Sequence, residues 1–353
     1  MRSASARPPS RGLAAWVRAH PRDTVAFAGL AVLVLWFAPP LLRWAVLDAT
    51  WTGESRQACG AGGACWAIVT ARWRQVLAGF YPEDHLWRVA LATLLLAGAA
   101  APLAWRRSAR YTPVIAPLAV VGALAVMHGA GVLPRAPTDY WGGFFLNLLI
   151  GVTASIFALP LGVLLALGRN GRLPAVRWLA TGFVEGVRAS PLIVLLFAAS
   201  VIVPLFTPAG VSLDKLTRAL VVITLFEAAY MAEAVRAGLR GAPRGQAEAA
   251  QALGLRRGQT LRLVVLPQAL RIATPALVNS FIGLFKDTSL IYVIGVLDVT
   301  GVLRNAVTDF AWQGLETEAY VFVALLFWSF CFGLSRWSRS LERRLDGSGR
   351  RPA

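Results

Sequence analysis

The sequence has few of the residues that soluble catalysis requires. Only 15% of its 353 residues are charged, and it contains three histidines and three cysteines. The histidines are scattered and form no set of metal ligands. There is no glycine-rich phosphate loop followed by Lys and Ser or Thr, and no Ser-His-Asp or paired-carboxylate arrangement. These absences predict that the chain is not an enzyme, does not itself hydrolyse ATP, and has no metal ion or other cofactor.

What the sequence has instead is apolar surface. Hydrophobic residues make up 57% of the chain, more than a soluble domain usually has. Several apolar runs reach the roughly 20 residues that a helix needs to cross a bilayer. We therefore predict an all-α polytopic membrane protein with about eight transmembrane helices, near residues 24–42, 89–105, 114–133, 142–168, 178–206, 219–235, 272–297 and 319–334.

The net charge of +17 raises the question of a nucleic-acid partner. The arginines, however, gather in short segments between apolar runs, and alternate connections contain most of the acids. Basic segments on one side of a membrane mark the cytoplasmic side. No segment interleaves basic and aromatic residues, so we expect membrane lipid and no nucleic acid around this chain. With eight spans, both termini are then cytoplasmic.

The order of spans and loops divides the chain into three parts. Composition changes near residues 134–140. Residues 1–140 form an N-terminal extension with three transmembrane helices and a large outer loop. Residues 141–340 hold five transmembrane helices and a long inner loop, and residues 341–353 form a basic cytoplasmic tail.

The outer loop contains two cysteines, Cys59 and Cys65, on either side of the glycine-rich segment GAGGA. They can pair in an oxidising compartment, and closing so short a loop would contribute about 2 kcal/mol. Two free thiols are the alternative. A zinc site is excluded because two cysteines cannot supply four ligands and no histidine cluster lies nearby. Cys331 lies in the last span and is interpreted as a small packing residue.

A polar segment separates the sixth and seventh apolar runs. Pro243 precedes a predicted short helix over 246–253, which Gly254 ends in a conformation that other residues resist. A second short helix is expected over 256–265, after which Pro267 redirects the chain into the membrane.

One face of the first short helix is apolar and consists mostly of small side chains. It is formed by Ala247, Ala250 and Leu253, with Ala249 beside it, and Glu248 is placed in the first turn, where a negative charge suits the helix dipole. Such a helix docks in a groove of a partner protein or lies on the lipid surface. The physical pattern leaves both open.

The spacing within this segment matches a known motif. It reads Glu-Ala-Ala, three residues, Gly, nine residues, an aliphatic residue, one residue, and Leu-Pro, at Glu248, Ala249, Ala250, Gly254, Val264, Leu266 and Pro267. This pattern resembles the signature loop of binding-protein-dependent ABC importer permeases. The resemblance implies that the loop is cytoplasmic and that these residues fit a cleft in an ATPase subunit.

Three further segments resemble the polar amino-acid branch of that family. They read VRASPLIVLLF, AAYMAEAVRAGLRGAPRGQ and NSFIGLFKDTSLIYVIG. The resemblance extends over about residues 141–337 and implies that the last five helices form the ABC importer permease core. The extra spans, with GACWAIV and GFYPEDHLWR outside, resemble a permease subunit of the general L-amino-acid transporters.

The resemblance implies a transmembrane permease subunit of an ATP-driven amino-acid importer in the bacterial inner membrane. Its expected partners are ABC ATPase subunits inside, a homologous permease subunit in a heterodimer, and a periplasmic amino-acid-binding protein outside. Two other classes remain open. An ion-gradient-driven secondary transporter would show internal repeats, and no clear repeat is visible. A non-transporting membrane scaffold would use the polar loop only to recruit a cytosolic protein.

The seventh span contains candidate residues for a substrate path. Lys286 and Asp287 are its only charges, and Asn279 lies about two turns before Lys286 on the same face. Charges within the bilayer must be solvated, paired or near an interface. Either Lys286 and Asp287 bond other helices and hold the bundle together, or these groups line a cavity with Asn279 and Ser280.

The fifth and sixth spans also contain charges. Glu233 and Arg236 lie three residues apart and are expected to pair on one helix face near the cytoplasm. Glu185 and Arg188 have the same spacing and are interpreted as structural. Glu227 lies deeper in the sixth span, where a charge usually faces a cavity or a partner.

Overall fold

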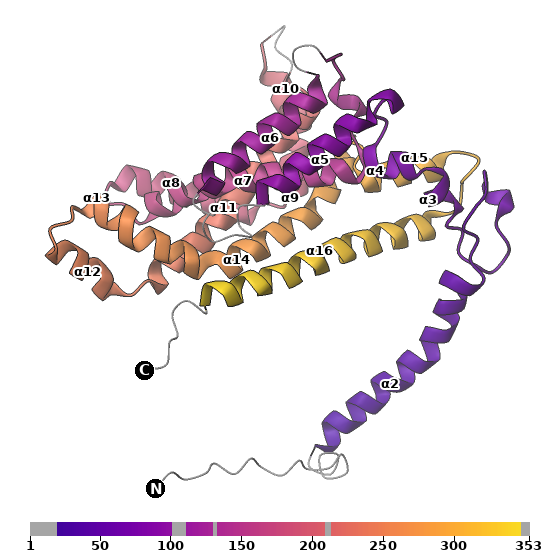
Figure 1. Cartoon of the computed structure of the whole chain (residues 1–353), viewed down its shortest axis with the longest axis horizontal. Coiled ribbons are helices and arrows are strands. Elements are labelled where there is room, and N and C mark those ends of the chain that lie inside the picture. The colour runs from indigo at the N-terminus through magenta and orange to yellow at the C-terminus, as the bar shows by residue number, and fades with distance from the viewer. Residues whose placement is uncertain (1–19, 101–110, 130–132, 209–212, 347–353) are drawn as a thin grey trace. The chain divides into compact units, whose positions relative to one another are not determined.

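The protein is all-helical in the computed structural model, which describes residues 20–100, 111–129, 133–208 and 213–346 (Figure 1). In these residues β pairing occurs only as isolated bridges, such as the one that joins Gly79 to Trp141. The chain separates into two compact units, residues 1–71 and 72–353.

The first unit begins with an apolar helix. Helix α2 covers Pro21–Leu42 and continues through a π-helical turn, Arg43–Leu47. Together they give 27 residues with a mean hydropathy of 2.2, which is long enough to cross a membrane. The first predicted span is therefore confirmed as a helix of spanning length.

The segment that follows in the first unit contains the 3₁₀ turn Arg56–Ala58 and helix α3, Ala67–Ala71. The Trp66 ring N–H donates to the carbonyl of Ala45 (2.7 Å), and the Trp66 ring centroid lies 6.0 Å from that of Trp44. A Cβ on Gly63 would lie 1.7 Å from the carbonyl oxygen of Asp48, so only glycine allows this close approach. The loop thus has a specific, packed structure.

Cys59 and Cys65 lie in this loop with their Cα atoms 5.6 Å apart, and their sulfur atoms are joined. We expect mass spectrometry of non-reduced peptides to show the loss of two hydrogens across this pair. Two alkylatable thiols in protein taken from an oxidising compartment would contradict the pairing.

The second unit opens with short elements and a helix pair. Helix α4 covers Trp73–Ala78, followed by the 3₁₀ turns Glu83–His85 and Thr138–Tyr140 on either side of helices α5, Leu86–Ala100, and α6, Thr112–His128. Helices α5 and α6 pack against each other. The second predicted span extends to residue 105 and the third to residue 133, and their ends lie outside the described residues.

Helices α7, Gly143–Arg169, and α11, Lys215–Gly241, form the centre of the second unit. These two helices approach each other closely at Gly162 of α7, because a Cβ there would lie only 2.8 Å from Cβ of Met231 in α11. Helix α7 is apolar, with a mean hydropathy of 2.4. Helix α11 is equally long but contains several charged residues, and it is not among the helices that pass as apolar spans.

The fifth predicted span is not one straight helix. Helix α8 covers Pro174–Ala189, and a second apolar run follows as α9, Leu192–Phe197, the π turn Ala198–Ile202, and α10, Val203–Phe206. The two parts are bent by 103°. The cause is Pro191, which disfavours helical geometry at the residue before it, and Ser190 is accordingly extended (φ −98°, ψ 134°).

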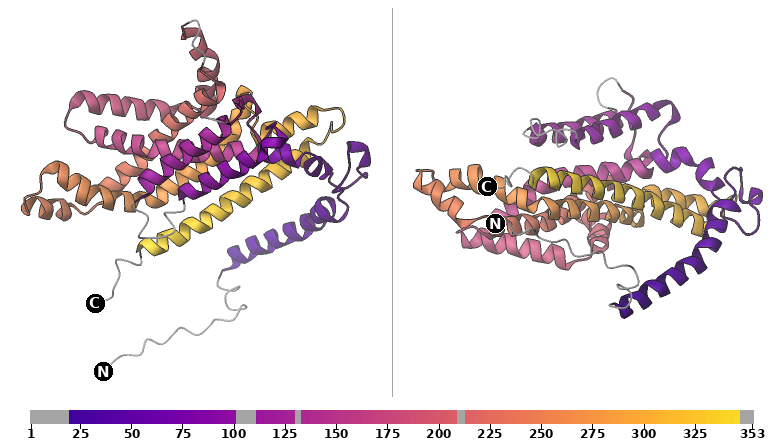
Figure 2. Two further views of the ribbon diagram at one scale, coloured as in Figure 1. Left: turned by 45° about the horizontal axis from the view of Figure 1, so that its top comes forward. Right: turned by 60° about the horizontal axis from the view of Figure 1, so that its bottom comes forward.

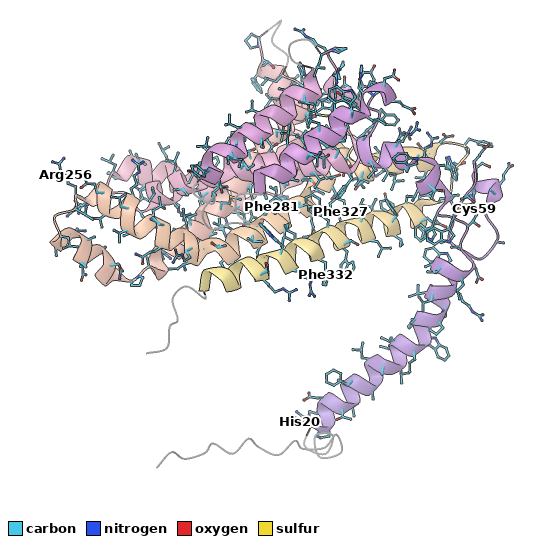
Figure 3. All side chains as sticks on the ribbon, in the orientation of Figure 1. His20, Cys59, Arg256, Phe281, Phe327 and Phe332 are labelled. Atoms are coloured by element: carbon cyan, nitrogen blue, oxygen red, sulfur yellow. A yellow bond between two sulfur atoms is a disulfide. The ribbon has the colours of Figure 1, made fainter. Side chains whose placement is uncertain are left out.

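The last helices run along the bundle. Helix α14 covers Leu266–Asp287 and continues as the 3₁₀ helix Thr288–Ile294, followed by α15, Val299–Thr308, and α16, Glu316–Asp346. Figures 1 and 2 show α16 beside α14, and Figure 3 labels Phe281 and Phe327 on these two neighbours. The rings of Phe285 and Phe330 stack there, with centroids 4.2 Å apart.

Fewer helices qualify as spans than the eight expected. In the described residues four are long and apolar enough to cross a membrane, at 21–47, 143–169, 257–294 and 316–340, and the bent pair gives a fifth if it counts as one span. These match the predicted spans near 24–42, 142–168, 272–297 and 319–334. The protein is therefore an all-helical polytopic membrane protein with about five apolar spans.

A buried polar network ties α7 to the segment before α15. The Asn147 side-chain amide donates to Thr288 Oγ1 (2.9 Å) and to Asp298 Oδ2 (3.0 Å), and Asn147 Oδ1 accepts from the Val299 backbone N–H (3.2 Å). Asp298 lies between spans, and burial raises the pKa of its carboxyl to about 6. The network fixes the end of the bundle opposite the polar loop.

Candidate functional site

The polar loop forms a compact pair of short helices at one end of the second unit. Helix α12 covers Arg244–Ala252, and helix α13 covers Arg257–Thr260 with the π turn η8, Leu261–Val265, directly after it. Figure 1 shows α12 and α13 at the end of the bundle opposite α4 and α15, and Figure 3 labels Arg256 at that end. A structured polar segment therefore projects from one side of the helix bundle.

Helix α12 begins earlier than the sequence suggested. Its N-terminal residue is Arg244 rather than Gln246, and no acidic residue lies in its first turn. The assignment of Glu248 to that turn is thus wrong, because Pro243 starts the helix two residues sooner. Glu248 is exposed on the helix surface. Its charge is available to a partner instead of neutralising the helix dipole.

The end of α12 confirms the role predicted for Gly254. Its φ is +86°, and the Gly254 N–H donates to the carbonyl of Gln251 (2.9 Å) while the Leu255 N–H donates to that of Ala250 (3.2 Å). These two bonds are the pair that defines a Schellman ending. A Cβ on Gly254 would meet no atom within 4 Å, so backbone conformation and not space requires glycine here.

The apolar face predicted for α12 is divided in the structure. Ala250 is only 5% exposed and Ala247 is half-buried, whereas Leu253 is 85% exposed. Helix α12 packs on η8 and on α13. The exposed surface of α12 and its C-cap includes Glu248, Ala249, Ala252 and Leu253, with Gly245, Gln246 and Gln251 also exposed.

The second short helix leads straight into α14. The Arg256 backbone N–H donates to Gln259 Oε1 (2.9 Å), which starts α13. Residues 257–294 then form one continuous helical run of 38 residues. Pro267 does not redirect the chain, because in the first turn of α14 its missing N–H is tolerated. Leu266 is half-buried and Pro267 exposed at this junction.

A cluster of charges joins three helices near the polar loop. Arg169 at the end of α7 bonds Glu233 of α11 (2.5 Å) and Glu185 of α8 (2.7 Å), and Glu233 also accepts from Arg236 (2.6 and 2.9 Å). The pair of Glu233 and Arg236 is confirmed. Glu185 pairs with Arg169 and not with its neighbour Arg188, whose guanidinium lies over the Tyr230 ring. Glu233 and Arg236, the members of the cluster in α11, lie near the end of that helix, and α12 follows a few residues later.

The four candidate path residues lie along α14. Asn279 and Lys286 are exposed on it, while Ser280 and Asp287 are half-buried. In the described residues none of these four side chains forms an ion pair within 4 Å. The buried groups Asn147, Thr288 and Asp298 were not anticipated. Their only sequence signal was a polar residue inside an apolar run, as in FFLNLLIG.

Residues 158–347 match the family model described as a binding-protein-dependent transport system inner membrane component. The chain belongs to this family. It is therefore a permease subunit of an ABC importer, a multi-pass inner membrane protein and not the ATPase. This confirms the resemblance seen in the Glu-Ala-Ala motif.

Two relatives extend the match to nearly the whole chain. The inner membrane amino-acid ABC transporter permease protein YhdY of Escherichia coli (strain K12) is 45% identical over 96% of this chain and 94% of that protein. The glutamate/glutamine/aspartate/asparagine transport system permease protein BztC of Rhodobacter capsulatus is 36% identical over 95% and 94%.

The same fold occurs in a solved structure. The crystal structure of an amino acid ABC transporter with histidines matches 57% of this chain and 92% of that chain, with 27% identity and a TM-score of 0.52. The matched part of this chain has the fold of an ABC importer permease.

Proposed function

We propose that this permease imports amino acids, that its loop 246–267 docks an ATPase subunit, and that α14 lines the translocation path. The observation that supports the substrate class is the 45% identity to an amino-acid permease over 96% of the chain. Purification of the native complex tests the proposal. We expect ABC ATPase subunits, a homologous permease and a periplasmic amino-acid-binding protein to copurify. A complex that lacks an ATPase would contradict it.

The surface of α12 supports docking over a purely lipid-bound helix. Glu248 and Leu253 are both exposed, and so are two small residues, Ala249 and Ala252, which allow close approach of a partner. A helix that lies on lipid needs a broad apolar face, and here Ala250 of that face is already buried within the protein. A groove in a protein partner suits a narrow face with one exposed leucine and one acid.

The connection from α12 to the spans supports a mechanical role. Helix α12 packs on η8, η8 continues into α14, and α14 packs on α11 and α16. Movement of a docked α12 is therefore transmitted to the helices that contain the candidate path residues. ATP drives import only if the ATP-bound ATPase prefers one conformation of the permease. Equal affinity for the two conformations would leave the equilibrium between them unchanged.

The orientation of the chain follows from the same loop. Docking to a cytosolic ATPase places α12 and α13 inside, and the opposite end of the second unit, with α15, faces the periplasm. With eight spans, three of them in the 1–140 extension and five in the 141–340 core, both termini and the basic tail 341–353 are cytoplasmic. A homologous permease subunit beside this one completes the path as a heterodimer.

Topology is tested by labelling. In a background without native cysteines, single cysteines at Arg256 and Glu316 should react with impermeant reagents from opposite sides of the membrane. The reason is that α13 and the start of α16 lie at opposite ends of the bundle. Labelling of both positions from the same side would contradict the proposed orientation.

The path is proposed to include Asn279, Ser280, Lys286 and Asp287. Ser280 is small and uncharged, which suits a broad range of substrates. Ser280→Glu is expected to shift uptake towards cationic and away from acidic amino acids by about tenfold, since one charge contact contributes about 1.5–3 kcal/mol. Uptake of arginine, glutamate and leucine at matched expression measures this. An unchanged ratio of the three would remove Ser280 from the path.

A further inference from the structure

Glu227 is a buried acid in the middle of the bundle whose role the docking and coupling proposal does not explain. It lies near the centre of α11, and its residue surface is only 3% exposed. Its Oε1 atom is buried and accepts no hydrogen bond. Buried carboxyl oxygens are nearly always bonded, because an unbonded charge in an apolar environment is costly.

Another acid of the same helix shows what a structural carboxylate looks like here. Glu233 lies six residues further along α11, and both of its oxygens accept bonds from Arg169 or Arg236. No arginine or lysine forms an ion pair with Glu227 in the described part of the chain. The two acids therefore differ in their bonding. Both oxygens of Glu233 are bonded within the protein, whereas Glu227 has an oxygen that a ligand could bond.

The packing of α11 on α14 places Glu227 along the path segment. A Cβ on Gly238 would lie 2.2 Å from the carbonyl oxygen of Ala269, so the two helices touch near their cytoplasmic ends. Further along, Leu277 packs on the cluster that contains Met231. The helices thus run antiparallel, with residues later in α14 facing residues earlier in α11.

The next turn brackets the height of Glu227. Ile223 and Phe226 of α11 belong to the same hydrophobic cluster as Leu284 of α14. Glu227 lies one turn before Met231, so the antiparallel register places it level with the turn of α14 that follows Leu277, where Ser280 and its neighbours lie.

The surroundings of Glu227 favour a positively charged ligand. The charged group that acts on its carboxyl is Asp287 of α14, a second acid, and not a cation. An ammonium group supplies a positive charge and up to three N–H donors, and the buried Oε1 of Glu227 has no donor.

We propose that Glu227 binds the ammonium group of the amino acid as it passes the middle of the permease. This rests on the proposed function and adds a residue on α11 to a path otherwise assigned to α14. The carboxylate and side chain of the substrate are then directed towards the residues on α14.

Direct binding tests the proposal. The complex is purified without the binding protein, and the probe is whichever of L-glutamine, L-arginine and L-leucine the wild type imports fastest, together with its N-acetyl derivative, which lacks the ammonium. We expect the wild type to bind the amino acid and not the derivative. Glu227→Gln should weaken amino-acid binding by about tenfold to hundredfold, because a charged hydrogen bond is lost. Glu227→Asp should retain part of the affinity.

Two comparisons keep the result interpretable. Glu233→Gln, on the same helix, should leave the affinity for the amino acid unchanged even if it lowers thermal stability. Glu227→Gln should be assayed only as intact complex, confirmed by its thermal unfolding. Unchanged affinity in Glu227→Gln, equal binding of the N-acetyl derivative, or no binding by a wild type that does import would each overturn the assignment. A wild type that imports none of the amino acids refutes the proposed function instead.

Discussion

Gly254→Val is expected to reduce ATP-coupled uptake by about tenfold. A left-handed backbone conformation costs a residue with a side chain about 1–2 kcal/mol, and more for a β-branched one. Gly254 has φ +86° and forms the Schellman ending of α12. The substitution therefore shifts the direction in which α12 is presented. ATP-dependent uptake into proteoliposomes and copurification of the ATPase measure the effect.

The chain offers a matched control for this prediction. Gly245 also lies in α12, and a Cβ there would meet no atom within 4 Å, but its φ is not positive. Gly245→Ala should behave like the wild type. Leu253→Asp alters only an exposed side chain, so it should lower ATPase association without changing the fold. Normal coupled transport in both Gly254→Val and Leu253→Asp would remove the support for docking.

Glu233→Gln is expected to destabilise the complex by about 3 kcal/mol and to lower coupled transport. Removing one member of a largely buried ion pair leaves the other charge without compensation. Arg169 has a side chain only 9% exposed and would lose one of its two carboxylate partners, and Arg236 would lose its partner altogether. Because the cluster joins α7, α8 and α11, its loss loosens the helices that lead to α12. Thermal unfolding and ATP-dependent uptake measure the two effects.

Glu185→Gln is the control, because the Glu185 side chain is 57% exposed. Exposed ion pairs contribute about 0–1 kcal/mol, so this change should be nearly neutral. If Glu233→Gln were no more destabilising than Glu185→Gln, the cluster would not hold the three helices together.

Local signals in the sequence were sufficient for part of this structure. The Glu-Ala-Ala motif with Gly254 placed the polar loop, and apolar length placed α2, α7, α14 and α16. These features depend on residues close together in the chain, such as a glycine where a helix must end. The start of α12 was missed by two residues, which is the usual uncertainty at helix ends.

Features that depend on distant residues could not be read from the sequence. Glu185 lies three residues before Arg188, yet its partner is Arg169 on another helix. The α12 face is split because Ala250 is buried where α12 packs on the following elements α13 and η8, and no local pattern shows which neighbour packs on a helix. The 103° bend at Pro191 is a partial exception, since the proline was visible but the sharpness of the turn was not.

Uptake by the reconstituted complex decides most directly whether this chain is the membrane subunit of an ATP-driven amino-acid importer. Proteoliposomes containing the permease pair and the ATPase should accumulate labelled amino acid only with ATP on the ATPase side and the binding protein on the other. Uptake that needs neither, and that follows an imposed ion gradient, would identify a secondary transporter and contradict this assignment.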